Sequence, residues 1–507
     1  MTGLKTDWPR WLEWAAMVAL LAIFSALACL FILSPSPSVI GQEQNSVFAV
    51  LRYQLTGTLF TEPDQFPFNV LQYGPVHYQF IRFVAGAFNL DPVAAHIYRV
   101  GRVLSVLANI LTVGVLWLGL RRLSSMSANA AALLSIGTLF ALMPWGFVIH
   151  PDPLHTLLVV CAVMLTLLAG PSISVGAVGL SCGIIAVAIF VKLTAICFLP
   201  LPLVLAMLHP RPRAHPVPYM IAALLACIPA VLIFGTGTIA RNWMVALQQP
   251  VDVRVAVLGT YLSVLQRQFV LAAAVLLAVI TAIRMRAALL GGVVLCAIWS
   301  GGVGLLLGLK VGAGPNYFLL FVVFAFLAGG VFAFPASSSQ TSAPGDEVGK
   351  RLSFTGLVLL YAGVQIGWIW SHIDNARSDR TGEFASLQQV LQAIPDPRGA
   401  ILELDGNLPI VAADRVMLAT SDVVSWTAMN TRLAHGSLVT MLRRHQVCWA
   451  IVAHPTWEAM NAAGTSPHMS SAQMAYLREV RSHFDDVLNL PARVLMRAKI
   501  CDPNNAQ

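Results

Sequence analysis

The chain has 507 residues, of which 57% are hydrophobic and only 11% are charged, and its mean hydropathy is +0.74. Soluble domains carry about 25% charged residues, so this composition excludes a soluble globular protein and indicates a polytopic membrane protein. A net charge of +8 would suggest a nucleic-acid partner in a soluble protein. Here most Lys and Arg residues lie in short loops, where they set membrane topology.

A membrane-spanning helix needs about 20 apolar residues, and we assign eleven such stretches. They are 11–33, 94–120, 127–148, 153–169, 173–190, 194–208, 217–235, 269–283, 288–309, 316–334 and 354–371. The stretch 173–208 is divided at Lys192, because a lysine in the middle of the bilayer costs about 3 kcal/mol.

Basic residues predict the orientation, because loops rich in Lys and Arg stay in the cytoplasm. Those that fall on one side of the map are Lys5, Arg10, Arg121, Arg122, Arg211, Arg213, Arg284, Arg286, Lys350 and Arg351. The N-terminus is then cytoplasmic, and an odd number of spans places the C-terminus outside, in a bacterial inner membrane.

Three outer segments are long: a first loop at 34–93, a second loop at 236–268, and a tail at 372–507. The first loop contains Val76–Phe88, which is apolar, aromatic and too short to span, and therefore suits the membrane surface. We expect a transmembrane domain over 1–371 and a small extracytoplasmic α/β domain over 372–507.

The tail alternates helix-like and strand-like stretches, which is typical of an α/β domain. Helix-like stretches are 381–394, 437–446 and 470–484, and strand-like stretches are 399–404, 409–412, 415–419, 448–453 and 493–498. Cys448 and Cys501 lie in or beside strands in a compartment that permits disulfides. We predict that they approach each other.

Glu43 follows the first span, where a carboxylate could accept a proton from an acceptor hydroxyl. A solvated loop acid or a charge at a helix N-terminus is the simpler alternative. Further along the same loop, Tyr73, His77 and Tyr78 surround a Gly-Pro turn. They could face an acceptor or anchor the chain in the headgroup region.

Arg99 and Arg102 lie near the outer end of the second span and could bind a lipid phosphate or extend to the interface. His150 and Asp152 lie in an outer turn, where Asp152 could be a second catalytic acid or a helix cap. In the second outer loop, Arg241, Arg254 and Arg267 could bind phosphate or remain solvated.

Lys192 and Lys310 lie at outer junctions, where the topology rule does not explain them, so they are candidates for anion binding. Asn316 and Tyr317 open the following span and could be donor-binding, cap or interface residues. Several cations and two carboxylates at one membrane boundary suit a phosphorylated lipid donor and an activated hydroxyl. The sequence has no CxxC or His/Cys spacing for a metal, so we assign no metal ligands, and the need for a divalent metal stays open.

An ordered set of motifs extends over roughly residues 10–335. It consists of Glu43, a Leu-x-Gly-x-Leu-Phe run at 55–60, Tyr-Gly-Pro-Val-His-Tyr at 73–78, Tyr-Arg-Val-Gly-Arg at 98–102, His-Pro-Asp-Pro-Leu at 150–154, Phe-Val-Lys-Leu-Thr-Ala at 190–195 and 310–318. In this order the sequence resembles the GT-C superfamily of integral-membrane glycosyltransferases. It is most similar to the bacterial branch related to protein O-mannosyltransferases and the lipid A aminoarabinose transferase.

The resemblance implies inverting transfer of a sugar from a polyprenyl-phosphate donor to an acceptor outside the cytoplasm, with a catalytic carboxylate in the first outer loop. Members often carry Asp-Glu where this chain has Gln42-Glu43. If the first acid is the base, Gln42 replaces it; if a single glutamate serves, Glu43 is the base. We adopt the second reading.

The leading hypothesis is therefore a glycosyltransferase with Glu43 as base and Asp152 as a second acid. Lys192 and Lys310 would lie near the donor phosphate, and Arg99, Arg102, Asn316 and Tyr317 would contact the donor. A transporter or flippase of lipid-linked intermediates would place charges at mid-depth on broken helices. A catalytically inactive scaffold, favoured by Gln42, would bind a partner through 372–507.

Overall fold

The structure is a computed structural model of the chain, and it describes most of the helical region and parts of the tail. The described residues are 8–34, 39, 43–63, 71–143, 145–169, 173–208, 216–247, 260–285, 288–310, 314–335, 344–377, 389–394, 400–403, 416–418, 440, 442–445, 447–461, 471–489 and 493–501.

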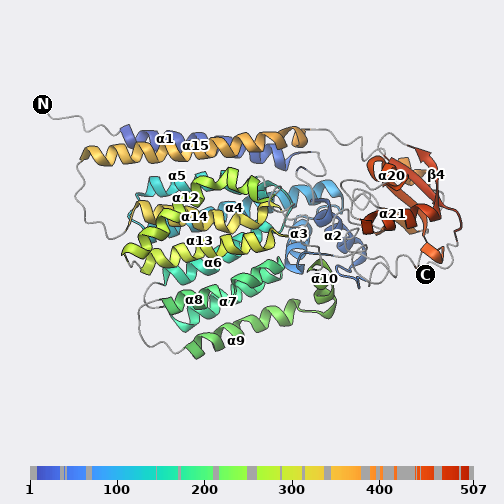
Figure 1. Cartoon of the computed structure of the whole chain (residues 1–507), viewed down its shortest axis with the longest axis horizontal. Helices are drawn as coiled ribbons and strands as arrows, with labels where there is room; N and C mark the ends of the chain where they lie inside the picture. Colours follow the sequence, from blue (N-terminus) through green and yellow to red (C-terminus); the bar gives the residue numbers. More distant parts are fainter. Residues whose placement is uncertain are drawn as a thin grey trace. The chain divides into compact units, whose positions relative to one another are not determined.

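Seven of the described helical segments are long and apolar enough to cross a membrane (Figure 1). They belong to α1 (Trp8–Ile32), α4 (Ala94–Leu123), α9 (Pro216–Phe234), α12 (Leu262–Met285), α13 (Ala288–Leu307), η5 with α14 (Pro315–Phe318, Leu319–Ala333) and α15 (Pro344–Arg377).

Four shorter apolar segments occupy the remaining predicted spans. They are α5 (Ala128–Leu142), α6 (Asp152–Leu168), α7 (Val175–Ile189) and η3 with α8 (Leu193–Phe198, Leu201–Leu208). The total of eleven spans stays a prediction, because these four segments are shorter than the about 20 residues that a membrane-spanning helix needs.

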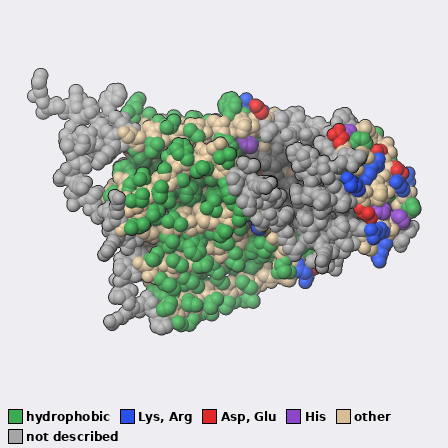
Figure 2. Space-filling model, in the orientation of Figure 1, with side chains coloured by type: hydrophobic (Ala, Val, Ile, Leu, Met, Phe, Trp, Pro, Cys, Tyr) green, Lys and Arg blue, Asp and Glu red, His purple; other side chains and the backbone are tan. Residues whose placement is uncertain are grey.

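Apolar side chains cover the surface of these helices, whereas charged side chains gather over the C-terminal α/β part (Figure 2). On α9, Leu232 is 78% exposed and Ile233 is 69% exposed. Exposed apolar surface of this extent is stable only against lipid. The chain is therefore an integral membrane protein.

The chain forms two compact units. The first contains 1–34, 102–234 and 251–375, and the second contains 35–101, 235–250 and 376–507. In the first unit α7 packs on α6 and α9, and α14 packs on α12 and α13. The predicted domain boundary after residue 371 stays a prediction.

Three helices of the second unit come from the outer loops. They are α2 (Glu43–Thr56), α3 (Pro75–Ala87) and α10 (Gly237–Leu247). Helix α3 begins after Gly74 with a proline in its first turn, where the missing amide proton is not needed. One face of α3 is buried, while Phe83 on the other is 72% exposed. This amphipathic helix agrees with the stretch we expected at the membrane surface.

The tail forms a five-stranded sheet in the order β2-β1-β3-β5-β4. The strands are β1 (Ala400–Glu403), β2 (Val416–Leu418), β3 (Val447–Ala453), β4 (Phe484–Asn489) and β5 (Arg493–Ala498), with helices α20 (His454–Asn461) and α21 (Ser471–His483). Strands β1, β2 and β3 run parallel, and β5 is antiparallel to β3 and β4.

A disulfide joins Cys448 in β3 to Cys501, with the two Cα atoms 5.1 Å apart. The predicted approach of these cysteines is confirmed. The tail also differs from the expectation in two places: α20 and β4 were not predicted. The expected strand at 409–412 lies outside the described residues, as do parts of the expected helices at 381–394 and 437–446.

Candidate functional site

Asp152 is the centre of a buried cluster in the first unit. It is the first residue of α6, and Pro151 at the N-cap position provides no side-chain capping hydrogen bond. The Asp152 carboxylate accepts from Lys192 Nζ at 2.7 Å and from Asn316 Nδ2 at 3.1 Å, and it contacts His150 Nδ1. The turn at 150–153 therefore aims the acid at other segments instead of at its own helix.

Lys192 lies between α7 and η3, where the backbone is extended. Its Nζ also lies 4.5 Å from the ring centre of Tyr317, a distance typical of a cation–π contact. Burial lowers the pKa of Lys310, and the neighbouring charge of Lys192 lowers it further. Because Asp152 neutralises one of two lysines, the cluster keeps net positive charge.

The structure adds two residues to this cluster that sequence reasoning missed. The ring centre of Trp145 lies 5.2 Å from that of His150. Among the described residues no acceptor bonds to the buried Trp145 Nε1. His155 is buried one turn after Asp152 and lies 3.5 Å from Thr194 Oγ1. Both lie within seven residues of Asp152, but periodicity alone makes them ordinary apolar-face residues.

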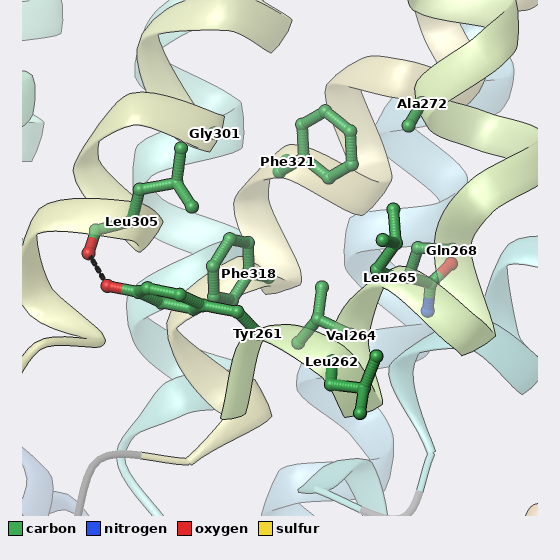
Figure 3. Close-up of a pocket in the computed structure, with 10 residues that line it drawn as sticks. All are labelled: Tyr261, Leu262, Val264, Leu265, Gln268, Ala272, Gly301, Leu305, Phe318 and Phe321. Atoms are coloured by element: carbon green, nitrogen blue, oxygen red, sulfur yellow. Dashed lines mark hydrogen bonds between the residues drawn. The ribbon is translucent and has the colours of Figure 1, made fainter. Parts of the chain in front are cut away.

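An apolar cavity of about 440 Å³ adjoins the segment that supplies Asn316 and Tyr317 (Figure 3). Its lining residues come from α12 and the residue before it, α13, η5 and α14. They are Tyr261, Leu262, Val264, Leu265, Gln268, Ala272, Gly301, Leu305, Phe318 and Phe321. Helix η5 thus carries Asn316 in the charged cluster and Phe318 in the cavity wall. The polar cluster and the apolar cavity are thus joined by residues two positions apart in η5.

Two glycines of α13 make room for the aromatic wall of this cavity. A Cβ atom on Gly304 would lie 2.9 Å from Phe318 Cδ1, and one on Gly308 would lie 2.6 Å from Tyr261 Cε1. Real Cβ atoms do not approach so closely. The Tyr261 hydroxyl donates to the Leu305 carbonyl and fixes that ring (Figure 3).

Glu43 belongs to the second unit and is the first residue of α2. It is fully buried, and its Oε2 accepts from the Val39 amide at 2.9 Å. An acid in the first turn interacts favourably with the helix dipole, so part of its role is structural. The neighbouring Gln42 lies outside the described residues.

Tyr73, His77 and Tyr78 form a buried aromatic group against α2. The ring of His77 lies 5.3 Å from that of Tyr78, and its Nε2 is 3.3 Å from Ser46 Oγ. Burial raises the pKa of Tyr78, which keeps its hydroxyl protonated. These three residues pack inside the unit, and the exposed aromatics of α3 lie on its opposite face.

Arg99 and Arg102, near the start of α4, differ in environment. Arg99 is exposed. Arg102 is fully buried and donates to the carbonyls of Phe31 at 3.1 Å and Ser34 at 2.9 Å. These carbonyls lie at the C-terminal end of α1, where backbone acceptors have no partner within the helix. We therefore propose a structural role for Arg102 in place of a phosphate contact.

Helix α10 fixes the first outer loop. Arg241 and Thr238 bond to Glu62, and hydrogen bonding to Arg241 lowers the pKa of this acid. Asn242 is fully buried: its Oδ1 accepts from the Leu71 amide, and its Nδ2 donates to the Thr61 carbonyl, both at 2.9 Å. These contacts hold both ends of the stretch 61–71.

The other two arginines expected in the second outer loop are placed differently. Arg267 lies in α12, with its guanidinium 3.5 Å from the ring centre of Trp368. Arg254 lies outside the described residues. In the part of the chain that the structure describes, no group of three or more His, Cys, Asp or Glu residues is placed to hold a metal.

Solved structures share this architecture at low sequence identity. ArnT of Cupriavidus metallidurans bound to undecaprenyl phosphate aligns over 94% of this chain and 97% of that chain, with 15% identity and a TM-score of 0.60. The same protein in the apo state has a TM-score of 0.62 over the same shares.

The archaeal oligosaccharyltransferase AglB from Archaeoglobus fulgidus, in complex with an inhibitory peptide and a dolichol-phosphate, aligns with a TM-score of 0.55 at 11% identity. The alignment covers 95% of this chain and 73% of that chain. Comparison with protein-family models and with curated proteins finds no match. The chain has the fold of GT-C membrane glycosyltransferases, which is the superfamily that its motifs resemble.

Proposed function

We propose that the protein is a membrane glycosyltransferase that moves a sugar from a polyprenyl-phosphate donor to an extracytoplasmic acceptor with inversion. The observation that carries the proposal is the charged cluster of Asp152, Lys192 and Lys310 beside an apolar cavity. Net positive charge suits the donor phosphate, and an apolar wall suits an isoprenoid chain. The structural neighbour bound to undecaprenyl phosphate supports this donor class.

In the proposed reaction an acceptor hydroxyl oxygen attacks the anomeric carbon of the sugar. The bond from that carbon to the phosphate oxygen breaks, and polyprenyl phosphate leaves with the bonding electrons. Attack from the face opposite the leaving group inverts the configuration. Glu43 takes the hydroxyl proton, and Lys310 with Lys192 stabilises the charge that develops on the phosphate.

Asp152 has a supporting role in this proposal. Its carboxylate binds Lys192 and Asn316 and thereby holds both donors in place. A second proton transfer by Asp152 is the alternative role predicted from the sequence. The proposed topology keeps the N-terminus in the cytoplasm and the C-terminus outside, in a bacterial inner membrane.

Glu43→Gln tests the base. The glutamine keeps the size and an oxygen that can accept from Val39 N–H, but it cannot take a proton. We expect transfer from a polyprenyl-phosphate sugar to fall by about 100-fold or more, while undecaprenyl phosphate still binds. Glu62→Gln is the matched control in the same unit and should retain near-normal transfer.

Lys310→Gln tests the donor site. Lys192 is less suitable, because its removal leaves Asp152 buried without a counter-ion. We expect Lys310→Gln to weaken undecaprenyl phosphate binding by about tenfold or more, as measured by native mass spectrometry. Lys499→Gln, on the C-terminal domain, should leave binding unchanged.

The outcomes separate the three sequence hypotheses. Normal transfer by Glu43→Gln would make Asp152 the next candidate for the base. Binding of undecaprenyl phosphate without any transfer, combined with its movement across vesicle membranes, would favour a flippase. The absence of lipid binding would favour a scaffold.

A further inference from the structure

Helix α2 is polar and yet buried over most of its length. Its first ten residues, from Glu43 to Arg52, are all buried, although they include Gln44, Asn45 and Ser46. Buried polar side chains in native proteins are nearly always hydrogen-bonded. On α2 three side-chain atoms have no hydrogen-bond partner among the residues that the structure describes: Gln44 Oε1, Arg52 Nη1 and Gln54 Oε1. The buried surface of α2 therefore carries polar atoms that are available to hydrogen-bond to a bound molecule.

Arg52 is the most costly of these groups. Its side chain is only 9% exposed. Within the described parts of the chain, no carboxylate lies within ion-pair distance of its guanidinium and no acceptor bonds to Nη1. Burial lowers the pKa of Arg52, but a guanidinium stays protonated under physiological conditions. A buried positive charge is therefore left without compensation.

Other arginines of the second unit have partners. Arg241 pairs with Glu62. Arg82 on α3 is exposed and lies 4.1 Å from the ring centre of Tyr53, the residue after Arg52. The fold thus provides partners for arginines in the same region, and Arg52 is the exception among them.

We propose that Arg52 anchors an oxyanion-binding site in the first outer loop, which takes a phosphate or carboxylate group of a bound molecule. A planar guanidinium with free donors matches the two oxygens of such a group. The anion supplies the negative charge that no described residue places beside Arg52.

The position of Arg52 on α2 separates this site from the candidate base. Arg52 is nine positions after Glu43, which corresponds to about 13.5 Å along a helix and to opposite faces. An anion bound at Arg52 is therefore held away from the Glu43 carboxylate. The site is therefore additional to the proposed base and, if transfer is confirmed, it recognises the acceptor or a second part of the donor.

A thermal-unfolding titration of the full-length protein in lipid nanodiscs tests the site. The probe is inorganic phosphate, added at constant ionic strength against chloride. All proteins in this titration also carry Lys310→Gln, which removes phosphate binding at the cluster around Asp152. The phosphate response then reports on Arg52 whether or not the donor binds at that cluster. Arg52→Gln is compared with Arg82→Gln, which removes an exposed, partnered arginine from the same unit.

We expect a saturable rise in melting temperature with phosphate in the parent and in Arg82→Gln. In Arg52→Gln the half-saturating concentration should rise by about tenfold or more. In chloride alone, Arg52→Gln should melt at or above the parent temperature, because it removes an uncompensated buried charge. An identical phosphate response in both variants would overturn the proposal.

A marked fall in the melting temperature of Arg52→Gln in chloride, restored by Arg52→Lys, would also overturn it, since the arginine would then have a partner within the protein. Undecaprenyl phosphate distinguishes the two sources of the anion. If the donor supplies the anion, Arg52→Gln weakens binding of this lipid when it is introduced into the protein that retains Lys310. If the acceptor supplies it, lipid binding is unchanged while the phosphate response is lost.

Discussion

The cluster around Asp152 and the helix α2 both bury charged side chains, but they satisfy them differently. Asp152 contacts Lys192, His150 and Asn316, so its charge is compensated before any ligand arrives. Arg52 on α2 has no such partner among the described residues. A compensated cluster is prepared to hold a ligand in fixed geometry, whereas an uncompensated charge itself attracts one.

This difference predicts opposite responses to mutation. Removing a member of a compensated buried pair leaves the other charge alone, which is strongly destabilising. Removing an uncompensated buried charge relieves a cost. The comparison can therefore be tested by stability measurements that do not depend on any assumed substrate.

The largest effect is expected for Asp152→Asn. The amide can still accept one hydrogen bond, but Lys192 loses its counter-ion in a buried site. We expect the free energy of unfolding to fall by about 3 to 5 kcal/mol, measured by denaturant titration in detergent micelles. Arg52→Gln should show no such loss.

Asp485→Asn is the control for removing a carboxylate. Asp485 is exposed on β4, and its nearest cation, Lys499, is 3.9 Å away, so the change should stay within about 0.5 kcal/mol. Adding Lys192→Met to Asp152→Asn should recover part of the loss, because no charge is then left unpaired. Equal losses for Asp152→Asn and Asp485→Asn would refute the compensated-pair interpretation.

A smaller effect is expected for Asn242→Ala, which breaks the attachment of α10 to the first outer loop. The change leaves the Leu71 amide and the Thr61 carbonyl without their partner. An unsatisfied buried polar group costs about 1 to 3 kcal/mol, and we expect a loss in that range. The exposed Asn461 on α20 provides the control, with Asn461→Ala expected within about 0.5 kcal/mol. Matching losses at the two asparagines would contradict the role of Asn242.

Hydropathy predicted most of the helical architecture, because the bilayer requires long apolar stretches whatever they pack against. The segments 11–32, 94–123 and 216–234 agree closely with the predicted spans. Helix α12 begins at Leu262 instead of 269, because its first turns carry Gln and Arg residues that lower the local hydropathy. Strand β4 was not predicted, since Asp485 and Asp486 do not follow strand propensity and pairing with β5 forms the strand.

The candidate site was predictable only in part. The unusual positions of Lys192 and Lys310 marked them from the sequence, and the turn at 150–153 marked Asp152. Their contacts were not predictable, because Asp152 and Asn316 are 164 residues apart. The lack of a partner for Arg52 has no sequence signal at all, since it depends on what the folded chain fails to place beside it.

The smallest effect concerns Glu62, which is paired like Asp152 but lies nearer to solvent. Hydrogen bonds from Arg241 and Thr238 lower the pKa of Glu62 below its usual value of 4.5. A lowered pKa means that the contact stabilises the fold above the unfolded pKa and is lost as the pH falls through the folded pKa. We expect hydrogen exchange of α10 amides, corrected for intrinsic rates, to increase below about pH 4.5. In Glu62→Gln the protection should already be reduced at pH 7 and should not change further over this range. A pH response of equal size in both proteins would show that another group controls this contact, because glutamine does not titrate.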